Sequence, residues 1–340
     1  MPEMSQIKPE EPHVGYLLEM QFAMAPTRVL SASLQLGIFS HIANGNTTAQ
    51  EIAKAAGTSE RGTRMLLDAL AAFRLVNKND GHYELTPLSS QFLVRSSPNY
   101  AGAIMETNAI WEFWSHLTDA IRTGKPLRTI TPQQAAEEFF PILVRSLHIL
   151  NWEPARRLAA SLGAGSSHQG LRAVDIACGS GVWGIAVAEA DRDARVTAQD
   201  FPNVLKLTRE YLRRHGVEDR YDFLPGDLKQ IDFGENQFDL ALLGNICHSE
   251  GEKSSRDLFK RLYRALRPRG RVAIIDMVPN EERTGPVFPI IFALNMLLQT
   301  DEGGTYTLGE YEQWLKEAGF IRVETAEIGL HSPIIIGIKS

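Results

Sequence analysis

Cysteine is scarce in this 340-residue sequence, with Cys178 and Cys247 as its only two representatives. Two cysteines so far apart cannot form the disulfide framework of a small secreted protein, so we expect a cytoplasmic chain. Long apolar runs are also missing. The longest, residues 287–298, has twelve residues and contains a proline, whereas a membrane-spanning helix needs about 20 apolar residues. We therefore expect no membrane partner.

An excess of basic residues is lacking as well. The chain has 35 lysines and arginines against 41 acidic residues, a net charge of -6. Because nucleic-acid binding draws on positive charge, we expect no nucleic-acid partner. What the sequence has instead is 44% hydrophobic residues spread over 340 positions. A chain of 340 residues is longer than one hydrophobic core usually serves, so we expect two domains.

The first domain is expected at residues 1–102. Thr48 and Glu51 have the spacing of a capping box that opens a short helix, and Gly57 follows at the position favoured by a helix end. A longer helix is expected from Ser59. The turn Asn79-Asp80-Gly81 then lies between two short strand-like segments and predicts a β-hairpin. Several helices followed by a hairpin are typical of a winged-helix domain.

Winged helices often bind DNA, so the charge of this region decides between two functions. Residues 1–100 contain eight basic and nine acidic residues. A DNA-binding module normally carries a basic stripe. We therefore predict that the domain forms a homodimer, and keep a DNA-binding, non-enzymatic regulator that senses a cofactor as an alternative.

The second domain is expected at residues 103–340, with connecting helices at 103–165 and a cofactor-binding part at 170–340. From residue 170 short β-rich segments alternate with amphipathic helices, which is typical of an α/β fold with a parallel sheet. Residues 321–328 and 332–338 predict a terminal antiparallel hairpin. The expected strands before it are residues 172–177, 195–198, 221–224, 238–243 and 271–275.

A glycine-bearing loop follows the first of these strands. Residues 179–184 read G-x-G-x-x-G, a pattern that alone fits a nicotinamide-dependent oxidoreductase. Asp175, at the entrance of the loop, argues against that reading because a carboxylate repels a pyrophosphate. S-adenosylmethionine contains an ammonium and a sulfonium and no phosphate. We therefore favour S-adenosylmethionine as the cofactor, with the oxidoreductase as the alternative.

Two further acidic residues follow neighbouring strands. Asp200 can accept hydrogen bonds from both ribose hydroxyls of the cofactor, and Asp227 can pair with the adenine amino group, with Leu228 against the adenine face. In open α/β sheets, ligands bind beyond the carboxyl ends of the strands, where these residues are expected. A plainer interpretation is that both aspartates cap the helices that follow them.

These motifs resemble those of the caffeic acid and hydroxyindole O-methyltransferase type, and especially its bacterial relatives. The resemblance extends over nearly the whole chain. It implies a winged-helix dimerisation domain, a Rossmann-like class I methyltransferase sheet ending in an antiparallel hairpin, and a small aromatic acceptor. By position, the resemblance assigns the cofactor to Ala177, Gly179, Asp200, Phe201, Asp227 and Leu228, and catalysis to His248; Gly181 and Asn245 are further candidate cofactor residues.

His248 follows the fourth predicted strand and precedes a helix expected near Glu252. A neutral histidine can take the proton of a hydroxyl while the methyl group is transferred. Asp276 is the expected orienting carboxylate, or else a cap of the next turn. The sequence departs from the family at Ala177-Cys178, at His248-Ser249-Glu250 and at Tyr306, so methylation at nitrogen or carbon stays an alternative.

The acceptor is expected to lie against aromatic and methionine side chains, which bind flat rings well. The same residues at helical spacing also fit an ordinary core. No metal site is predicted, because Cys178, Cys247 and His248 lack a fourth ligand at fixed spacing. The candidate acceptor residues are Trp111, Trp114, Phe288, Phe292, Asn295, Met296 and Tyr306.

Overall fold

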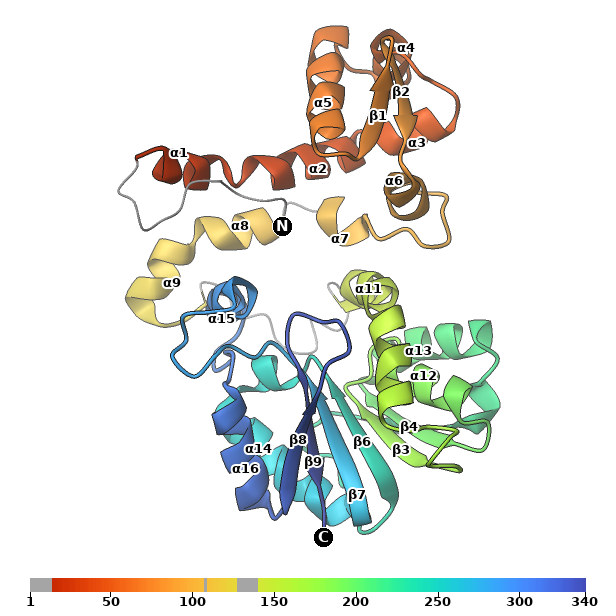
Figure 1. Cartoon of the computed structure of the whole chain (residues 1–340), viewed down its shortest axis with the longest axis vertical. Coiled ribbons are helices and arrows are strands. Elements are labelled where there is room, and N and C mark those ends of the chain that lie inside the picture. Colours follow the sequence, from red (N-terminus) through yellow and green to blue (C-terminus); the bar gives the residue numbers. More distant parts are fainter. Residues whose placement is uncertain (1–13, 107–108, 127–139) are drawn as a thin grey trace. The chain divides into compact units, whose positions relative to one another are not determined.

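The computed structural model describes residues 14–106, 109–126 and 140–340. The chain divides into two compact units, Met1–Ile110 and Trp111–Ser340, drawn in Figure 1. Within the described residues, no helix is long and apolar enough to span a bilayer.

The first unit is mainly helical, with one hairpin. Thr48 caps its fourth helix, since its hydroxyl accepts a hydrogen bond from the Glu51 backbone N–H while the Glu51 carboxylate accepts one from the Thr48 N–H. This confirms the predicted capping box, and Gly57 ends the helix at φ 66°. The elements are α1 (Val14–Phe22), α2 (Ala25–Gln35), α3 (Ile38–Ala43), α4 (Ala49–Ala56), α5 (Glu60–Ala72), β1 (Val76–Asn79), β2 (His82–Leu85), α6 (Pro87–Phe92) and α7 (Ala103–Glu106).

Helix α1 exposes large apolar side chains. Val14, Leu17 and Phe22 are 64–73% exposed, and no residue of this helix is buried. The core of the unit is formed instead by α2 to α5 and the hairpin, with Phe39, Leu67 and Tyr83 almost fully buried. A contiguous exposed apolar surface of this kind is typical of an interaction site.

The second unit contains a seven-stranded sheet in the order β5-β4-β3-β6-β7-β9-β8. The first five strands in this order, β5, β4, β3, β6 and β7, are parallel to one another, and β9 is antiparallel to both of its neighbours, β7 and β8. The predicted parallel sheet and terminal hairpin are confirmed. The strands are β3 (Arg172–Ile176), β4 (Arg195–Asp200), β5 (Tyr221–Pro225), β6 (Phe238–Gly244), β7 (Leu266–Ile275), β8 (Arg322–Ala326) and β9 (Ile334–Ile338).

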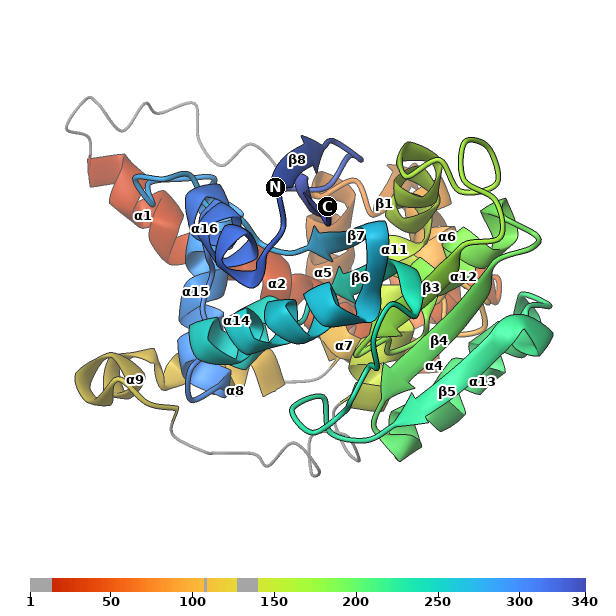
Figure 2. The same cartoon turned by 90° about the horizontal axis from the view of Figure 1, so that it is seen from below.

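Helices cover both faces of this sheet, as Figure 2 shows. Helices α12 and α13 pack on one face and α14 and α16 on the other, which gives two apolar cores. Helix α8 crosses the boundary between the two units. The helices are α8 (Ala109–Ser115), α9 (Leu117–Thr123), α11 (Phe140–Ser161), α12 (Val182–Ala190), α13 (Pro202–Arg214), the short 3-10 helix η2 (Glu218–Arg220), α14 (Cys247–Ala265), α15 (Val287–Gln299) and α16 (Leu308–Ala318).

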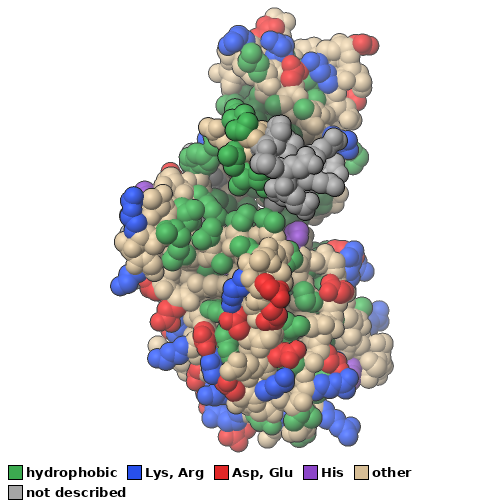
Figure 3. Space-filling model, turned by 60° about the vertical axis from the view of Figure 1, so that its left-hand side comes forward, with side chains coloured by type: hydrophobic (Ala, Val, Ile, Leu, Met, Phe, Trp, Pro, Cys, Tyr) green, Lys and Arg blue, Asp and Glu red, His purple; other side chains and the backbone are tan. Residues whose placement is uncertain are grey.

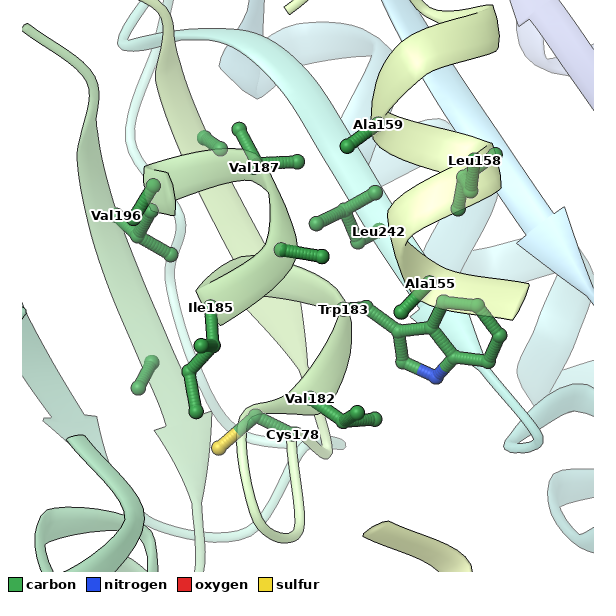
Figure 4. Packing of buried hydrophobic residues seen from close by; sticks show 14 of the residues in the cluster. Ala155, Leu158, Ala159, Cys178, Val182, Trp183, Ile185, Val187, Val196 and Leu242 are labelled. Carbon is green, nitrogen blue, oxygen red and sulfur yellow. The ribbon is translucent and has the colours of Figure 1, made fainter. Parts of the chain in front are cut away.

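Trp183 joins α12 to the core beneath α11 (Figure 4). Its indole lies so close to Gly244, at the end of β6, that a Cβ on that glycine would clash with it. Ala155 and Leu158 of α11 pack in the same cluster. The first turn of α12, which carries the glycine loop, is thereby fixed against the sheet.

Charges of both signs are interspersed on the visible face of the second unit, in the lower part of Figure 3. Ion pairs of the second unit include Arg256 with Glu252 and Arg283 with Glu310. Exposed pairs of this kind contribute little to stability.

Candidate active site

The glycine loop between β3 and α12 has an unusual backbone. Ala177, Gly179 and Gly181 have φ angles of 48°, 56° and 76°, all in the left-handed region. Glycine adopts this conformation without steric cost, whereas alanine is strained in it. Gly181 is also the N-cap of α12, and a Cβ there would come within 3.2 Å of Thr208. The loop therefore presents its backbone directly at the carboxyl edge of the sheet.

Asp200, the last residue of β4, holds this loop in place. Its Oδ2 accepts a hydrogen bond from the Gly179 N–H at 2.9 Å, and its Oδ1 accepts one from the Phe201 N–H at 2.7 Å. Burial raises the pKa of the Asp200 carboxyl to about 6, while the two backbone hydrogen bonds oppose that rise. Each carboxylate oxygen retains a lone pair for a further donor.

The neighbouring Gln199 joins two loops, and sequence reasoning missed it. Its side-chain oxygen accepts a hydrogen bond from the Ala177 N–H, and its amide donates one to the Gly226 carbonyl at 2.8 Å. Nothing in a single strand-end glutamine distinguishes it by sequence. The loops after β3 and β5 are thus held together from the end of β4.

Asp175 differs from our expectation. It lies within β3, its side chain is fully buried, and its Oδ2 accepts a hydrogen bond from the Gly184 N–H in α12. Burial raises the pKa of this carboxyl to about 8. The expectation that this carboxylate faces a cationic ligand is therefore wrong: the side chain points into the α12 side of the sheet, where it supports the loop from below.

The other predicted nucleoside residues, Asp227, Leu228 and Phe201, differ in burial and in what they contact. Asp227 is half-buried and accepts a hydrogen bond from the Lys229 N–H within a turn; β6 is the next element along the chain, so the alternative that Asp227 caps a following helix is wrong. Leu228 is buried in the core on the α14 side, so the prediction that it lies open to a ligand face needs correction. Phe201, at the start of α13, is half-buried and packs against the other core.

His248 and Asp276 form a close buried pair. Nδ1 of His248 lies 2.5 Å from Oδ1 of Asp276, and the His248 N–H donates to Oδ2 at 3.0 Å. Their side chains are 10% and 1% exposed. The two residues come from the ends of the neighbouring strands β6 and β7. His248 lies in the first turn of α14, which begins at Cys247 and is kinked at Gly251, earlier than the helix start we expected.

Two additional groups donate hydrogen bonds to Asp276. The Met277 N–H donates to Oδ1 at 2.8 Å, and the Tyr311 hydroxyl donates to Oδ2 at 3.1 Å. Burial and the nearby Asp276 raise the pKa of Tyr311 well above its usual range. The carboxylate is thereby satisfied as an acceptor, and its position beside His248 is fixed from β7 and α16. Sequence reasoning missed Tyr311, whose distance from Asp276 along the chain gave no signal.

The candidate acceptor residues separate into two groups. Phe292 contacts the His248 ring edge-on, with centroids 4.9 Å apart, and Phe288 lies next to it on α15. Tyr306 packs instead against Tyr311 and Trp314 in the core, so its predicted place on the acceptor wall is wrong. Of the remaining candidates, Met296 is buried, Asn295 and Trp114 are half-buried and Trp111 is 43% exposed.

A buried histidine that sequence reasoning did not single out supports the glycine loop. His148 of α11 is within hydrogen-bond distance of the Ser180 hydroxyl, with Nδ1 and Oγ 2.9 Å apart, and its ring stacks on Tyr211 at 4.0 Å. Burial lowers the pKa of His148 to about 3. The imidazole is therefore neutral.

Comparison with known proteins places these features in a family. Residues 164–321 match the model of the O-methyltransferase domain, and residues 18–95 match that of the O-methyltransferase dimerisation domain. The chain belongs to the O-methyltransferase family. Enzymes of this family depend on S-adenosylmethionine, and this chain is an S-adenosylmethionine-dependent methyltransferase. The nicotinamide interpretation of G-x-G-x-x-G is not favoured, because both matching family models are those of O-methyltransferases.

Relatives of this O-methyltransferase are similar over their whole lengths. A 3-hydroxy-5-methyl-1-naphthoate 3-O-methyltransferase from Streptomyces sahachiroi is 28% identical, with 95% of each chain covered. The S-adenosyl-L-methionine-dependent methyl transferase PigF from Serratia is 26% identical, with 92% of each covered. The solved structure of a candidate O-methyltransferase from Nostoc punctiforme is 28% identical with a TM-score of 0.85, and the match covers 97% of this chain and 100% of that one.

Proposed function

We propose that this enzyme methylates a hydroxyl group on a small aromatic acceptor, with His248 as the general base. The observation that carries the proposal is the buried pair of His248 and Asp276 at the carboxyl edge of the sheet, beside Phe292. A histidine held by a carboxylate in this way is typical of a base that removes a proton from oxygen.

The hydrogen bond fixes the chemistry of the imidazole. Since the Asp276 carboxylate accepts from Nδ1–H, the other ring nitrogen, Nε2, is left with a lone pair. That nitrogen takes the proton of the acceptor hydroxyl as the oxygen forms its bond to the methyl carbon. When bound, S-adenosylmethionine supplies a methyl group on a sulfonium, whose carbon–sulfur bond breaks to leave a neutral thioether. The remaining requirement is alignment of the acceptor oxygen, which the chain provides by positioning.

The residues around the glycine loop fit the cofactor. We assign its methionine part to the backbone of Ala177, Gly179 and Gly181 and to Asn245, because the left-handed loop lets a ligand approach closely. Asp200 receives the ribose hydroxyls, beside Phe201. Asp227 is assigned to the adenine.

The aromatic class of the acceptor is supported by Phe292 and Phe288 on α15, which present ring edges and faces beside His248. The naphthoate named for the Streptomyces sahachiroi relative is a flat, two-ring hydroxyarene. Trp111, Trp114, Asn295 and Met296 stay candidates for the same chamber.

A homodimer formed through the first unit is part of the proposal. The match to the dimerisation domain covers residues 18–95, and α1 exposes an apolar surface that a second copy can cover.

The test compares wild-type enzyme with His248→Ala and, as a matched control, with His168→Ala, which removes an exposed histidine. Methyl-ether formation is followed by mass spectrometry across a panel of hydroxyarenes with S-adenosylmethionine. We expect His248→Ala to lower kcat by about 100-fold or more, since general-base catalysis contributes about 10² to 10⁴. The control variant should keep wild-type turnover. Unchanged turnover in His248→Ala would remove the histidine from the mechanism, and stabilisation by NAD but not by S-adenosylhomocysteine would overturn the cofactor.

A further inference from the structure

A small cavity lies next to the His248–Asp276 pair. Its volume is about 40 Å³, and Asp276 forms part of its wall. Of the other side chains around it, Asn245 is assigned to the cofactor, and the proposed reaction uses none of the rest. The lining residues are Asn151 of α11, Asn245 after β6, Ile275, Asp276 and Met277 at the end of β7, and Leu330, His331 and Ser332 between β8 and β9.

Three polar side chains of this cavity lack partners. Within the part of the chain that the structure describes, the side-chain amides of Asn151 and Asn245 and the imidazole of His331 make no hydrogen bond. Asp276, by contrast, already accepts from His248, Met277 and Tyr311. Asn151 and Asn245 are half-buried and His331 is exposed, so water or a ligand can supply their hydrogen bonds. The cavity therefore offers two amides and an imidazole to an occupant.

Aromatic contacts connect this cavity to the acceptor wall. The His331 ring lies 5.1 Å from Phe288, Phe288 lies 5.8 Å from Phe292, and Phe292 lies 4.9 Å from His248. His248 in turn donates a hydrogen bond to Asp276, which lines the cavity. An aromatic ring that lies along Phe292 and Phe288 with its hydroxyl at His248 can therefore direct a neighbouring substituent into the cavity.

The size of the cavity limits that substituent. A cavity that binds benzene has a volume of about 150 Å³, so a cavity of about 40 Å³ takes a small oxygen-bearing group and no ring. Its charge limits the substituent further. The described lining residues include a carboxylate, Asp276, and no lysine or arginine. An anionic substituent would be desolvated beside a like charge, whereas amides and an imidazole both donate to and accept from a neutral hydroxyl or carbonyl oxygen.

We propose that Asn151 and His331 form a subsite that binds a neutral oxygen substituent of the acceptor, and that this subsite selects hydroxyarenes with a second hydroxyl or carbonyl over hydroxyarenes with a carboxylate. The inference rests on the proposed function, because it deepens the description of the same acceptor. His331 and Asn151 are specificity-determining residues in this account.

The test measures binding of three two-ring probes to enzyme saturated with S-adenosylhomocysteine, by calorimetry at pH 8. The probes are 2,3-dihydroxynaphthalene, 2-naphthol and 3-hydroxy-2-naphthoate, which share the ring and one hydroxyl and differ in the neighbouring group. We expect the diol to bind about 10-fold more tightly than 2-naphthol, as one satisfied hydrogen-bonding substituent predicts, and the naphthoate to bind more weakly than the diol.

Variants then assign the effect to the cavity. His331→Leu and Asn151→Leu should each reduce the preference for the diol over 2-naphthol to about threefold or less. His331→Asn, which keeps a hydrogen-bonding group, should restore part of it. His168→Leu should keep the wild-type preference. The affinity for S-adenosylhomocysteine, measured first, reports whether each variant is folded.

Four results would overturn the subsite: equal affinity for the diol and 2-naphthol in the wild type, tighter binding of the naphthoate than of the diol, an unchanged preference in both leucine variants, or no binding of any probe. An equal loss of S-adenosylhomocysteine and diol affinity in His331→Leu would assign the cavity to the cofactor and overturn it too. The proposed function fails separately, by unchanged methyl transfer in His248→Ala.

Discussion

Replacing Asp276 by asparagine should nearly abolish turnover while leaving the fold and the cofactor site in place. The carboxylate accepts hydrogen bonds from the His248 side chain and backbone, from Met277 and from Tyr311. An amide has one oxygen to accept and an NH2 group that donates. If the NH2 group faces His248, it donates to Nδ1 and moves the imidazole proton to Nε2. The ring nitrogen that faces the acceptor then cannot take a proton.

The size of the effect follows from the geometry. An imidazole held in the wrong tautomer by an Asp-to-Asn change costs about 10⁴ in kcat in the serine protease triad, so we expect a loss of about 10² to 10⁴ here. One or two of the hydrogen bonds to the carboxylate are lost, at about 1.5–3 kcal/mol for each bond to a charged group. The variant should therefore be less stable and still folded.

Single-turnover rates with S-adenosylmethionine, together with calorimetry of S-adenosylhomocysteine, separate chemistry from cofactor binding. Tyr311→Phe is the matched control, because it removes one donor to Asp276 and leaves the bond to His248 intact. We expect it to lower kcat by less than about 10-fold, in keeping with one hydrogen bond. A kcat of Asp276→Asn within threefold of wild type, with normal S-adenosylhomocysteine affinity, would refute an orienting role for the carboxylate.

Four other predictions concern the supporting structure. Because the pKa of Asp200 is raised to about 6 and ribose hydroxyls favour its ionised form, S-adenosylhomocysteine affinity should fall as the pH drops from 7 to 5, and calorimetry of Asp200→Asn should show no such dependence. The pKa of Asp175 is about 8 in the folded state and lower in the unfolded state, so its contribution to native stability falls as the pH rises toward 8. The Tm of Asp175→Asn should therefore rise relative to that of the wild type between pH 6 and pH 9. A Tm difference that stays constant over this range would contradict the burial of Asp175 as a neutral acid. The depressed pKa of His148, about 3, means that native stability is lost as the pH falls below about 6.5, so the wild-type Tm should drop more steeply than that of His148→Gln between pH 7.5 and 5. Leu17→Lys in α1 should convert the dimer to a monomer in light scattering, whereas Arg74→Lys should not.

Sequence patterns predicted most of the fold because each pattern has a local physical cause. The capping box at Thr48 and Glu51 and the turn at Asp80-Gly81 depend on neighbouring residues only, and both form as expected. The alternation of strands and helices predicted the parallel sheet and its terminal hairpin.

Sequence patterns placed the site residues that follow the ends of strands. They misplaced a residue within a strand, where the direction of the side chain decides which face of the sheet it lies on. Asp200 and His248 lie at the expected edge, while Asp175, inside β3, alternates to the face under α12. Tyr311 and His148 support the site from elements remote in sequence, through contacts that only the folded chain creates. A single sequence contains no measure of such distances.

The two residues at the end of β4 hold the loops after β3 and β5 independently of the residues proposed to bind the acceptor. Gln199 and Asp200 bind the backbone of the loops that follow β3 and β5, so they act on main-chain atoms whatever side chains those loops carry. The aromatic wall, in contrast, consists of side chains on α15, which makes none of these bonds. Mutations on α15 that change the acceptor specificity can therefore accumulate without disturbing the hydrogen bonds from Gln199 and Asp200 to these loops, and variant libraries for new substrates should begin on α15.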